Sequence, residues 1–278
     1  MKIAVSMWSL HREFYGGRLD VLDFIRWVAG TKADGVELLD VFWKDPDTES
    51  PKVLAALAEN NLAVGAYAVG NNFVVPCAEE RARQLGIITR GIDMAKYLKT
   101  KVVRVFAGDL AGGIEFDEAR GWIVEGLREA AAYAEKKGIT LALENHGLLA
   151  GKGAQVQGII ADVGSPALKA TIDTGNFLLV DEEPTDAVEI LAPLAGHVHF
   201  KDFRLAKDGE NPSYPALSGK RFAGTIIGEG QVDTRQVLAT LKASGYSGWL
   251  SVEFEGLEEE KYGAARSIDN LVAALKEI

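Results

Sequence analysis

Short apolar runs alternate with amphipathic helical patterns eight times along the 278-residue chain. Apolar runs of four to eight residues, each followed by a longer helical pattern, are typical of β–α units. Eight units in this length leave about 35 residues for each unit, which is the density of a β/α barrel. We therefore expect an α/β fold in which residues 1–278 form a single TIM (β/α)8 barrel domain.

The expected strands and helices have plausible boundary signals. Strand-like runs lie at 3–8, 36–40, 63–69, 102–107, 139–146, 170–174, 197–203 and 250–255, and helical patterns lie near 19–30, 51–60, 79–98, 117–137, 154–163, 185–191, 234–244 and 261–276. Ser50 followed by Pro51 predicts a helix start with proline at the first helical position. Gly138 after two lysines predicts a helix end.

The main structural alternative is a doubly wound open sheet. That fold would carry a glycine-rich phosphate turn after its first strand, and residues 6–17 contain no GxGxxG. The one long irregular segment is 204–230, after the seventh strand. Loops of this length in compact domains are usually lids or binding loops, so we expect this segment to cover the site.

Composition and charge exclude several classes of function. Forty acidic residues against 30 basic ones give a net charge of −10, which argues against nucleic acid or an anionic membrane as the main partner. No run approaches the roughly 20 apolar residues that span a bilayer, and the start of the chain lacks a signal-peptide pattern. We therefore expect a cytoplasmic protein. The single cysteine, Cys77, excludes an internal disulfide and is expected to be an ordinary thiol.

Polar residues stand near the C-terminal ends of the last four expected strands. They are Glu144, Asp173, His199 and Glu253, separated by 29, 26 and 54 residues. When the long irregular segment is left out, each gap is about one strand–helix repeat. Because functional groups of β/α barrels project from the C-terminal ends of the strands, we expect the four side chains to converge at one mouth of the barrel.

Three carboxylates and one imidazole at one mouth indicate a divalent metal. Each residue alone could make an ordinary ion pair, but grouped buried carboxylates repel one another and a cation relieves that repulsion. We expect one ion, with Mn²⁺ first and Mg²⁺, Co²⁺ or Zn²⁺ as alternatives, held by Glu144, Asp173, His199 and Glu253. A closed structural zinc site would favour Cys and His ligands instead.

These residues lie in motifs that resemble the xylose isomerase-like TIM barrel superfamily, the sugar phosphate isomerase/epimerase family, over nearly the whole chain. The motifs are LENHG at 143–147, DTGN at 173–176, HVHFKD at 197–202, IGEGQVD at 227–233 and GY-x-G-x-L-S-V-E at 245–253. In relatives that epimerise ketoses, the four strand-end residues bind the metal. The resemblance therefore implies the same four ligands here, with Glu144 and Glu253 as the catalytic acid/base pair.

The activity that the resemblance implies is a metal-dependent isomerase or epimerase that acts on a keto sugar or sugar derivative through an enediolate. Two differences separate the chain from the family's ketose 3-epimerases: Asn176 stands where they carry histidine, and its segment after the seventh-strand histidine is longer. The main alternative is a lyase or dehydratase that acts on a keto-inositol or a 3-keto glycoside by the same proton abstraction. Further alternatives are a non-catalytic binding barrel and the AP endonuclease branch, whose trinuclear zinc site needs more than the four histidines present.

Several other residues are candidates for substrate binding. His146 and Asn176 stand beside metal ligands and are expected to bind substrate hydroxyls, with simple loop packing as the alternative. Lys201 shares a strand face with His199 and could neutralise an enolate oxygen or a phosphate, or pair with Glu255 or Glu229. The expected partner is a small-molecule carbohydrate, and a homo-oligomer stays open.

Residues from other elements complete the set. Glu37 is expected to orient a substrate hydroxyl, Trp43 to contribute to an apolar wall for a sugar ring, and Arg221 to reach the substrate from its loop. Arg104 is expected to be an ion-pair partner inside the barrel, and His197 a core histidine.

Overall fold

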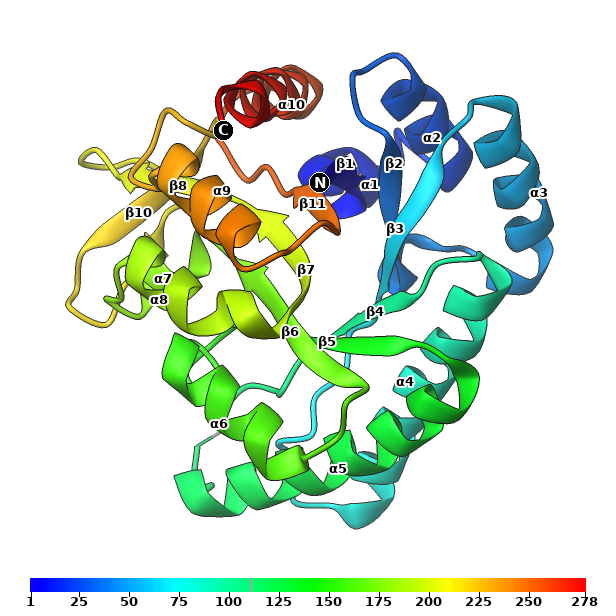
Figure 1. Cartoon of the computed structure of the whole chain (residues 1–278), viewed down its shortest axis with the longest axis vertical. Coiled ribbons are helices and arrows are strands. Elements are labelled where there is room, and N and C mark those ends of the chain that lie inside the picture. The colour runs from blue at the N-terminus through cyan, green and yellow to red at the C-terminus, as the bar shows by residue number, and fades with distance from the viewer. Residues whose placement is uncertain (111) are drawn as a thin grey trace.

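The barrel predicted from the alternating pattern is present in the computed structural model, which describes residues 1–110 and 112–278. Within these residues, eight parallel strands close into a ring in the order β1, β11, β7, β6, β5, β4, β3, β2. Helices surround this ring (Figure 1). The strands are β1 (Lys2–Ser6), β2 (Gly35–Leu39), β3 (Ala63–Ala68), β4 (Val102–Val105), β5 (Thr140–Glu144), β6 (Leu168–Asp173), β7 (Ala195–Phe200) and β11 (Trp249–Val252).

The helices bury one apolar face against the barrel. In α2 the buried residues Val21, Phe24, Ile25 and Val28 follow the spacing of one helical face. The helices are α1 (His11–Tyr15), α2 (Val21–Ala29), α3 (Pro46–Glu59), α4 (Ala78–Tyr97), α5 (Phe116–Lys137), α6 (Gly153–Val163), α7 (Asn176–Leu179), α8 (Pro184–Leu191), α9 (Thr234–Ala243) and α10 (Glu260–Glu277), with 3-10 turns η1 (Met7–Leu10), η2 (Asp40–Phe42) and η3 (Ala192–Leu194). In the described ranges, none of the helices has the length and apolar composition needed to cross a membrane.

One of the two predicted helix boundaries is confirmed and the other is wrong. Gly138 ends α5 in the left-handed conformation, with φ at 70°. The helix expected to start at Pro51 instead starts at Pro46, because the side chain of Asp45 accepts the backbone N–H of Asp47 and caps the earlier turn. Pro51 therefore lies inside α3.

The expected seventh strand is also divided in two. β7 ends at Phe200, and the chain then forms β8 (Asp202–Leu205), which pairs in antiparallel fashion with β10 (Arg221–Thr225). β10 also pairs with β9 (Tyr214–Pro215), and this small sheet lies outside the ring of barrel strands (Figure 1). The segment 204–230 therefore contains strands where one irregular loop was expected.

Candidate functional site

The four expected metal ligands meet at the C-terminal mouth of the barrel. Glu144 and Asp173 are the last residues of β5 and β6, His199 lies near the end of β7, and Glu253 follows β11. Parallel pairing sets Asp173 opposite His199, and His199 opposite Ser251. One donor atom from each of the four side chains lies within 4.8 Å of the others, and all four residues are buried.

His199 stands at the centre of this group. Its Nδ1 atom lies 3.4 Å from Glu144 Oε2, 3.5 Å from Glu253 Oε2 and 3.9 Å from Asp173 Oδ2. His199 Nδ1 is buried and makes no hydrogen bond among the described residues, although three carboxylate oxygens converge on it. Buried polar atoms are rarely left without a partner, so this convergence fits a divalent ion with nitrogen and oxygen ligands.

The DTGN segment fixes how Asp173 presents its carboxylate. Asp173 Oδ1 accepts the backbone N–H groups of Gly175 and Asn176 at 2.9 and 3.0 Å, which leaves Oδ2 for the site. Glycine is needed at 175 because a Cβ there would lie 2.9 Å from Cγ of Lys201. The turn therefore both orients the ligand and makes room for Lys201.

Two asparagines hold the ends of β5 and β6 together. Asn145 accepts the backbone N–H of Asp173 at 2.6 Å and donates to the carbonyl oxygen of Asp173 at 2.9 Å. Asn176 donates to the backbone oxygen of Asn145 at 3.0 Å and to Glu144 Oε1 at 3.3 Å. The position of Glu144 relative to Asp173 is therefore set by side-chain hydrogen bonds as well as by strand pairing.

Glu37 orients His199 through a hydrogen bond to its ring. Its two carboxylate oxygens lie 2.9 Å from His199 Nε2 and 3.2 Å from His197 Nε2. A hydrogen bond at Nε2 leaves the Nδ1 lone pair of His199 free to bind a metal. Burial raises the pKa of Glu37, but His199 and His197 outweigh it and hold that pKa well below its usual range.

This arrangement departs from the role expected for Glu37 and agrees with that expected for His197. Glu37 is completely buried and is not among the residues that line the pocket, because both of its oxygens face the histidines. The structure therefore does not bring Glu37 to a substrate. His197 is a core residue, as expected.

Two cations face the carboxylates. Lys201 Nζ lies 2.8 Å from Glu253 Oε2, 2.8 Å from Glu255 Oε1 and 3.0 Å from Asp173 Oδ2. Arg104 Nε lies 3.1 Å from Glu144 Oε2, and Arg104 Nη1 donates at 3.0 Å to the backbone oxygen of Val69, the residue after β3. The expected ion-pair roles of Arg104 and of Lys201 with Glu255 are both present.

The surroundings separate the pKa values of the four ligands. Burial raises the pKa of Asp173 to about 7 and also raises that of Glu144. Burial alone would lower the pKa of His199, but Glu37, Glu253 and Glu144 raise it to about 10. Burial likewise disfavours the charge of Glu253, but Lys201 and His199 lower its pKa to about 2. The two glutamates of the site therefore differ in proton affinity.

A pocket of about 440 Å³ opens above these residues. It is lined by Glu144, Glu253 and three of the expected substrate-binding residues, His146, Asn176 and Lys201. Its aromatic wall consists of Trp8, Tyr15, Phe106, Phe203 and Tyr214. A metal site with an apolar wall and a few polar groups is the usual form of a small-molecule site.

Two other expected substrate-binding residues do not reach this pocket. Trp43 is buried against Tyr67, with ring centroids 6.3 Å apart. Arg221 is exposed on β10, where it donates to Ser213, and it lines a separate surface cavity. Arg221 precedes the buried Phe222 on β10, and because successive side chains of a strand point to opposite faces, Arg221 lies on the exposed face.

The sequence reasoning also missed two polar residues at the site. Ser6 Oγ donates to Glu253 Oε1 at 3.3 Å, and Asp40 lines the pocket. Ser6 and Asp40 are polar residues at or just after strand ends, so the rule applied to the last four strands would have found them. Tyr214 carried no such signal, because it lies within the segment expected to be irregular.

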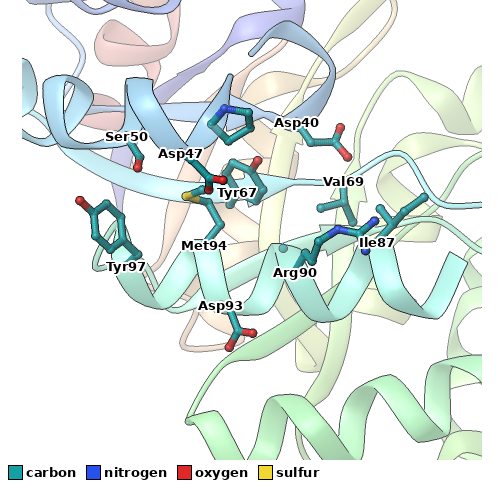
Figure 2. A pocket seen from close by; sticks show the side chains of 12 residues that line it. Asp40, Asp47, Ser50, Tyr67, Val69, Ile87, Arg90, Asp93, Met94 and Tyr97 are labelled. Carbon is teal, nitrogen blue, oxygen red and sulfur yellow. The ribbon is translucent and has the colours of Figure 1, made fainter. Parts of the chain in front are cut away.

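A larger cavity of about 710 Å³ lies on the outer wall of the barrel (Figure 2). It is lined by residues of α3, β3 and α4, among them Ser50, Tyr67 and Arg90. It contains none of the four ligands and shares only Asp40 with the pocket above them. The smaller pocket is therefore the one that adjoins the four expected ligands.

Comparisons with known proteins agree with the barrel fold. Residues 25–275 match the protein-family model described as "Xylose isomerase-like TIM barrel". Inosose dehydratase from Bacillus licheniformis is 31% identical over 149 residues, which cover 50% of this chain and 48% of that protein. The chain thus aligns with about half the length of the curated relatives that it matches.

Solved structures share the whole fold. A D-tagatose 3-epimerase-like protein has a TM-score of 0.80 at 22% identity, over 100% of this chain and 98% of that one. A xylose isomerase-like TIM barrel protein from Mycobacterium smegmatis, in complex with magnesium, has a TM-score of 0.78 at 19% identity, over 99% and 97%. At these identities the likeness concerns the fold.

Proposed function

Because the chain belongs to the xylose isomerase-like TIM barrel family, we propose that it is a divalent-metal-dependent isomerase or epimerase of a keto sugar or sugar derivative. The observation that carries this proposal is the convergence of four buried donor atoms, one from each of Glu144, Asp173, His199 and Glu253, beside a pocket lined by two of these glutamates. Support for a carbohydrate substrate comes from relatives described as an inosose dehydratase and a D-tagatose 3-epimerase-like protein.

The metal would be held by Glu144, Asp173, His199 and Glu253. We propose Mn²⁺ as the ion, with Mg²⁺ as the nearest alternative because one structural neighbour is described with magnesium. When bound, such an ion would polarise the substrate carbonyl and make the adjacent C–H more acidic.

The two glutamates would move the proton. Glu253 has the lowered pKa and is ionised, so it is the group that would take a proton from the carbon beside the carbonyl. Glu144 has the raised pKa and would return a proton to the resulting enediolate. Asn176 and Arg104 hold Glu144, whereas Ser6 and Lys201 hold Glu253, so each carboxylate has its own positioning contacts.

A dehydratase is the second candidate. It is favoured by the inosose dehydratases among the curated relatives, one of which, from Bacillus thuringiensis, is 27% identical over 139 residues that cover 48% of this chain and 46% of that protein. Dehydration begins with the same abstraction of a proton beside a carbonyl. It differs in the next step, when a hydroxyl on the neighbouring carbon leaves as water.

One experiment separates these reactions. The Mn²⁺-loaded protein is incubated in D₂O with a panel of keto sugars, keto-inositols and 3-keto glycosides, and the products are followed by proton NMR and mass spectrometry. An isomerase or epimerase incorporates deuterium and keeps every oxygen, whereas a dehydratase loses water. If no carbonyl substrate exchanges a C–H proton under metal-saturated conditions, the proposed chemistry is wrong.

Metal content tests the remaining alternative, a barrel that binds a ligand without catalysis. The proposal predicts one bound divalent ion per chain after purification in Mn²⁺ and dialysis, measured by elemental analysis. A protein that retains no ion and still binds a sugar would favour the binding barrel.

A further inference from the structure

The cations that line the pocket are already neutralised. Lys201 lies within 3.0 Å of three carboxylates, those of Glu253, Glu255 and Asp173. Arg104 lies 3.1 Å from Glu144. Among the described residues that line the pocket, no other lysine or arginine is present.

His146, which also lines the pocket, already has a carboxylate beside it, because its Nδ1 atom lies 3.8 Å from Asp109 Oδ1. Arg221, the other basic residue expected at the substrate, lines a different cavity. The side chains of the pocket therefore offer no unpaired cation to an anionic group.

The nearby backbone N–H groups already donate hydrogen bonds to carboxylates of the chain itself. Many β/α barrels bind phosphate with loops after the seventh and eighth strands of the barrel. Here, in the loop after β10, the N–H groups of Gly228, Gly230 and Val232 donate to Asp202 at 2.9, 2.9 and 3.1 Å. The side chain of Asp202 thus occupies the position in which a phosphate would receive these hydrogen bonds.

The same is true at two other points around the site. The N–H groups at the start of α7 donate to Asp173, and the N–H of Gly70 donates to Asp40 at 3.1 Å. A phosphate would have to displace a carboxylate to gain any of these donors. Displacement of a bonded carboxylate is costly, because it leaves that charge without its partners.

The charge balance disfavours an anion even when a metal is bound. Five carboxyl groups surround the pocket and ligand group, namely those of Asp40, Glu144, Asp173, Glu253 and Glu255, against two cations, Lys201 and Arg104. With Glu144 carrying the proton that it would donate, a divalent ion and the two cations balance the other four carboxylates and leave no positive charge for a phosphate. An added phosphate would therefore bring uncompensated negative charge into a partly buried site, where repulsion is weakly screened.

We propose that the pocket admits uncharged sugar derivatives and excludes their phosphorylated counterparts, and that Glu255 and Asp40 enforce this selection. The inference rests on the proposed function in taking a keto sugar as the ligand. Glu255 acts by neutralising Lys201, the one lysine close enough to the ligand group to hold a phosphate. Asp40 acts by its own charge at the pocket wall and by occupying the N–H of Gly70. The aromatic wall supplies contacts for the apolar faces of an uncharged ring.

The test compares matched ligands on the Mn²⁺-loaded protein. D-fructose, D-psicose and D-tagatose are each paired with their 6-phosphates, and binding is measured by the change in water-proton relaxation caused by the bound Mn²⁺. The wild type is expected to bind each neutral sugar at least about tenfold more tightly than its phosphate. Glu255→Gln is expected to reduce the ratio of neutral-sugar affinity to sugar-phosphate affinity by about threefold or more, because Lys201 then loses one of its carboxylate partners.

Two further variants make the outcome interpretable. Asp40→Asn is also expected to lower the ratio of neutral-sugar affinity to sugar-phosphate affinity. It takes the place of Glu255→Gln in the test if Glu255→Gln does not fold. Glu59→Gln removes the same charge from an exposed residue at the end of α3, outside the pocket, and is expected to leave the ratio unchanged.

Several results would overturn the inference: equal or tighter binding of a phosphorylated sugar to the wild type, binding of neither member of any pair, or an unchanged ratio in the folded pocket variants. Failure of the proposed function looks different. In that case neutral sugars bind with the expected preference but exchange no C–H proton in D₂O. If instead a phosphorylated sugar binds tightly and exchanges its proton, the chemistry stands and the charge selection is wrong.

Discussion

Asp173 and His199 stand opposite each other in the register between β6 and β7, with Asp173 Oδ2 and His199 Nδ1 3.9 Å apart. His199 Nδ1 makes no hydrogen bond among the described residues, and Lys201 Nζ lies 3.0 Å from Asp173 Oδ2. Since parallel pairing fixes the two backbones, the two donor atoms are held at this separation before any ion arrives. A site that is preorganised in this way spends little binding energy on ordering its ligands.

The first prediction concerns one proposed metal ligand, Asp173, and the residue that orients another, Glu37. Asp173→Asn removes a charged oxygen from the ligand group and is expected to abolish stoichiometric binding of Mn²⁺. Glu37→Gln leaves all four ligands in place but weakens the hydrogen bond that orients His199, so it is expected to weaken Mn²⁺ binding by about 10- to 100-fold. Electron paramagnetic resonance of free Mn²⁺ measures both effects.

Glu59→Gln removes the same charge from an exposed residue and is the control for both Asp173→Asn and Glu37→Gln. Wild-type affinity in Asp173→Asn would remove Asp173 from the ligand set. An unchanged affinity in a folded Glu37→Gln protein would show that the orientation of His199 does not depend on Glu37.

The second prediction concerns pH. Metal binding requires ionised carboxylates and a neutral imidazole. With the pKa of His199 near 10 and that of Asp173 near 7, protons compete with the ion at both residues. Mn²⁺ affinity should therefore rise with pH, with about one proton released per ion between pH 7 and 10 and about two below pH 7.

Calorimetric titrations in buffers of different ionisation enthalpy count these protons directly. An affinity that does not change between pH 6 and 9 would mean that His199 and Asp173 are already deprotonated in the metal-free protein, contrary to their surroundings.

The sequence predicted the barrel and the convergence of four polar side chains at one mouth for a physical reason. The alternation of side chains along a strand and the position of its end can both be predicted from local periodicity. These two features were enough to predict that Glu144, Asp173, His199 and Glu253 meet at one mouth of the barrel, as they do. The roles of Glu37 and Arg221 required information that periodicity does not contain. Glu37 lies in the middle of β2, and its place beside His197 and His199 follows from packing across the ring of strands.

The small outer sheet shows a second limit of local pattern. Phe203 and Phe222 are buried, but their strands pair with each other across a long connection. Such pairing depends on contacts between residues distant in the chain, so propensity alone predicts it poorly. Tyr214 lines the pocket as a residue of this sheet, so no local pattern in the sequence could have selected it.

The third prediction concerns stability. The metal-free protein holds three carboxylates within 4 Å of His199, and an ion that binds only the folded state stabilises it. Mn²⁺ at about 100 times its Kd should add about 2.7 kcal/mol to the free energy of unfolding, and raise Tm by about 5 °C or more. EDTA should reverse the rise, and Asp173→Asn should lack it. A Tm that is the same with and without Mn²⁺ in the wild type would argue against a metal at this site.

The fourth prediction separates the roles of the two glutamates. Glu253→Gln cannot accept a proton from carbon, so turnover should fall by about 10²- to 10⁴-fold, and proton–deuterium exchange at the substrate carbon should fall with it. Glu144→Gln should lose net turnover but keep part of this exchange, because Glu253 still removes the proton and can return it to the same position. Both variants also change a metal ligand, so rates are compared at saturating Mn²⁺, with occupancy measured for each protein. If exchange is lost in Glu144→Gln and kept in Glu253→Gln, the two roles are reversed; if neither rate changes, neither residue is the acid or the base.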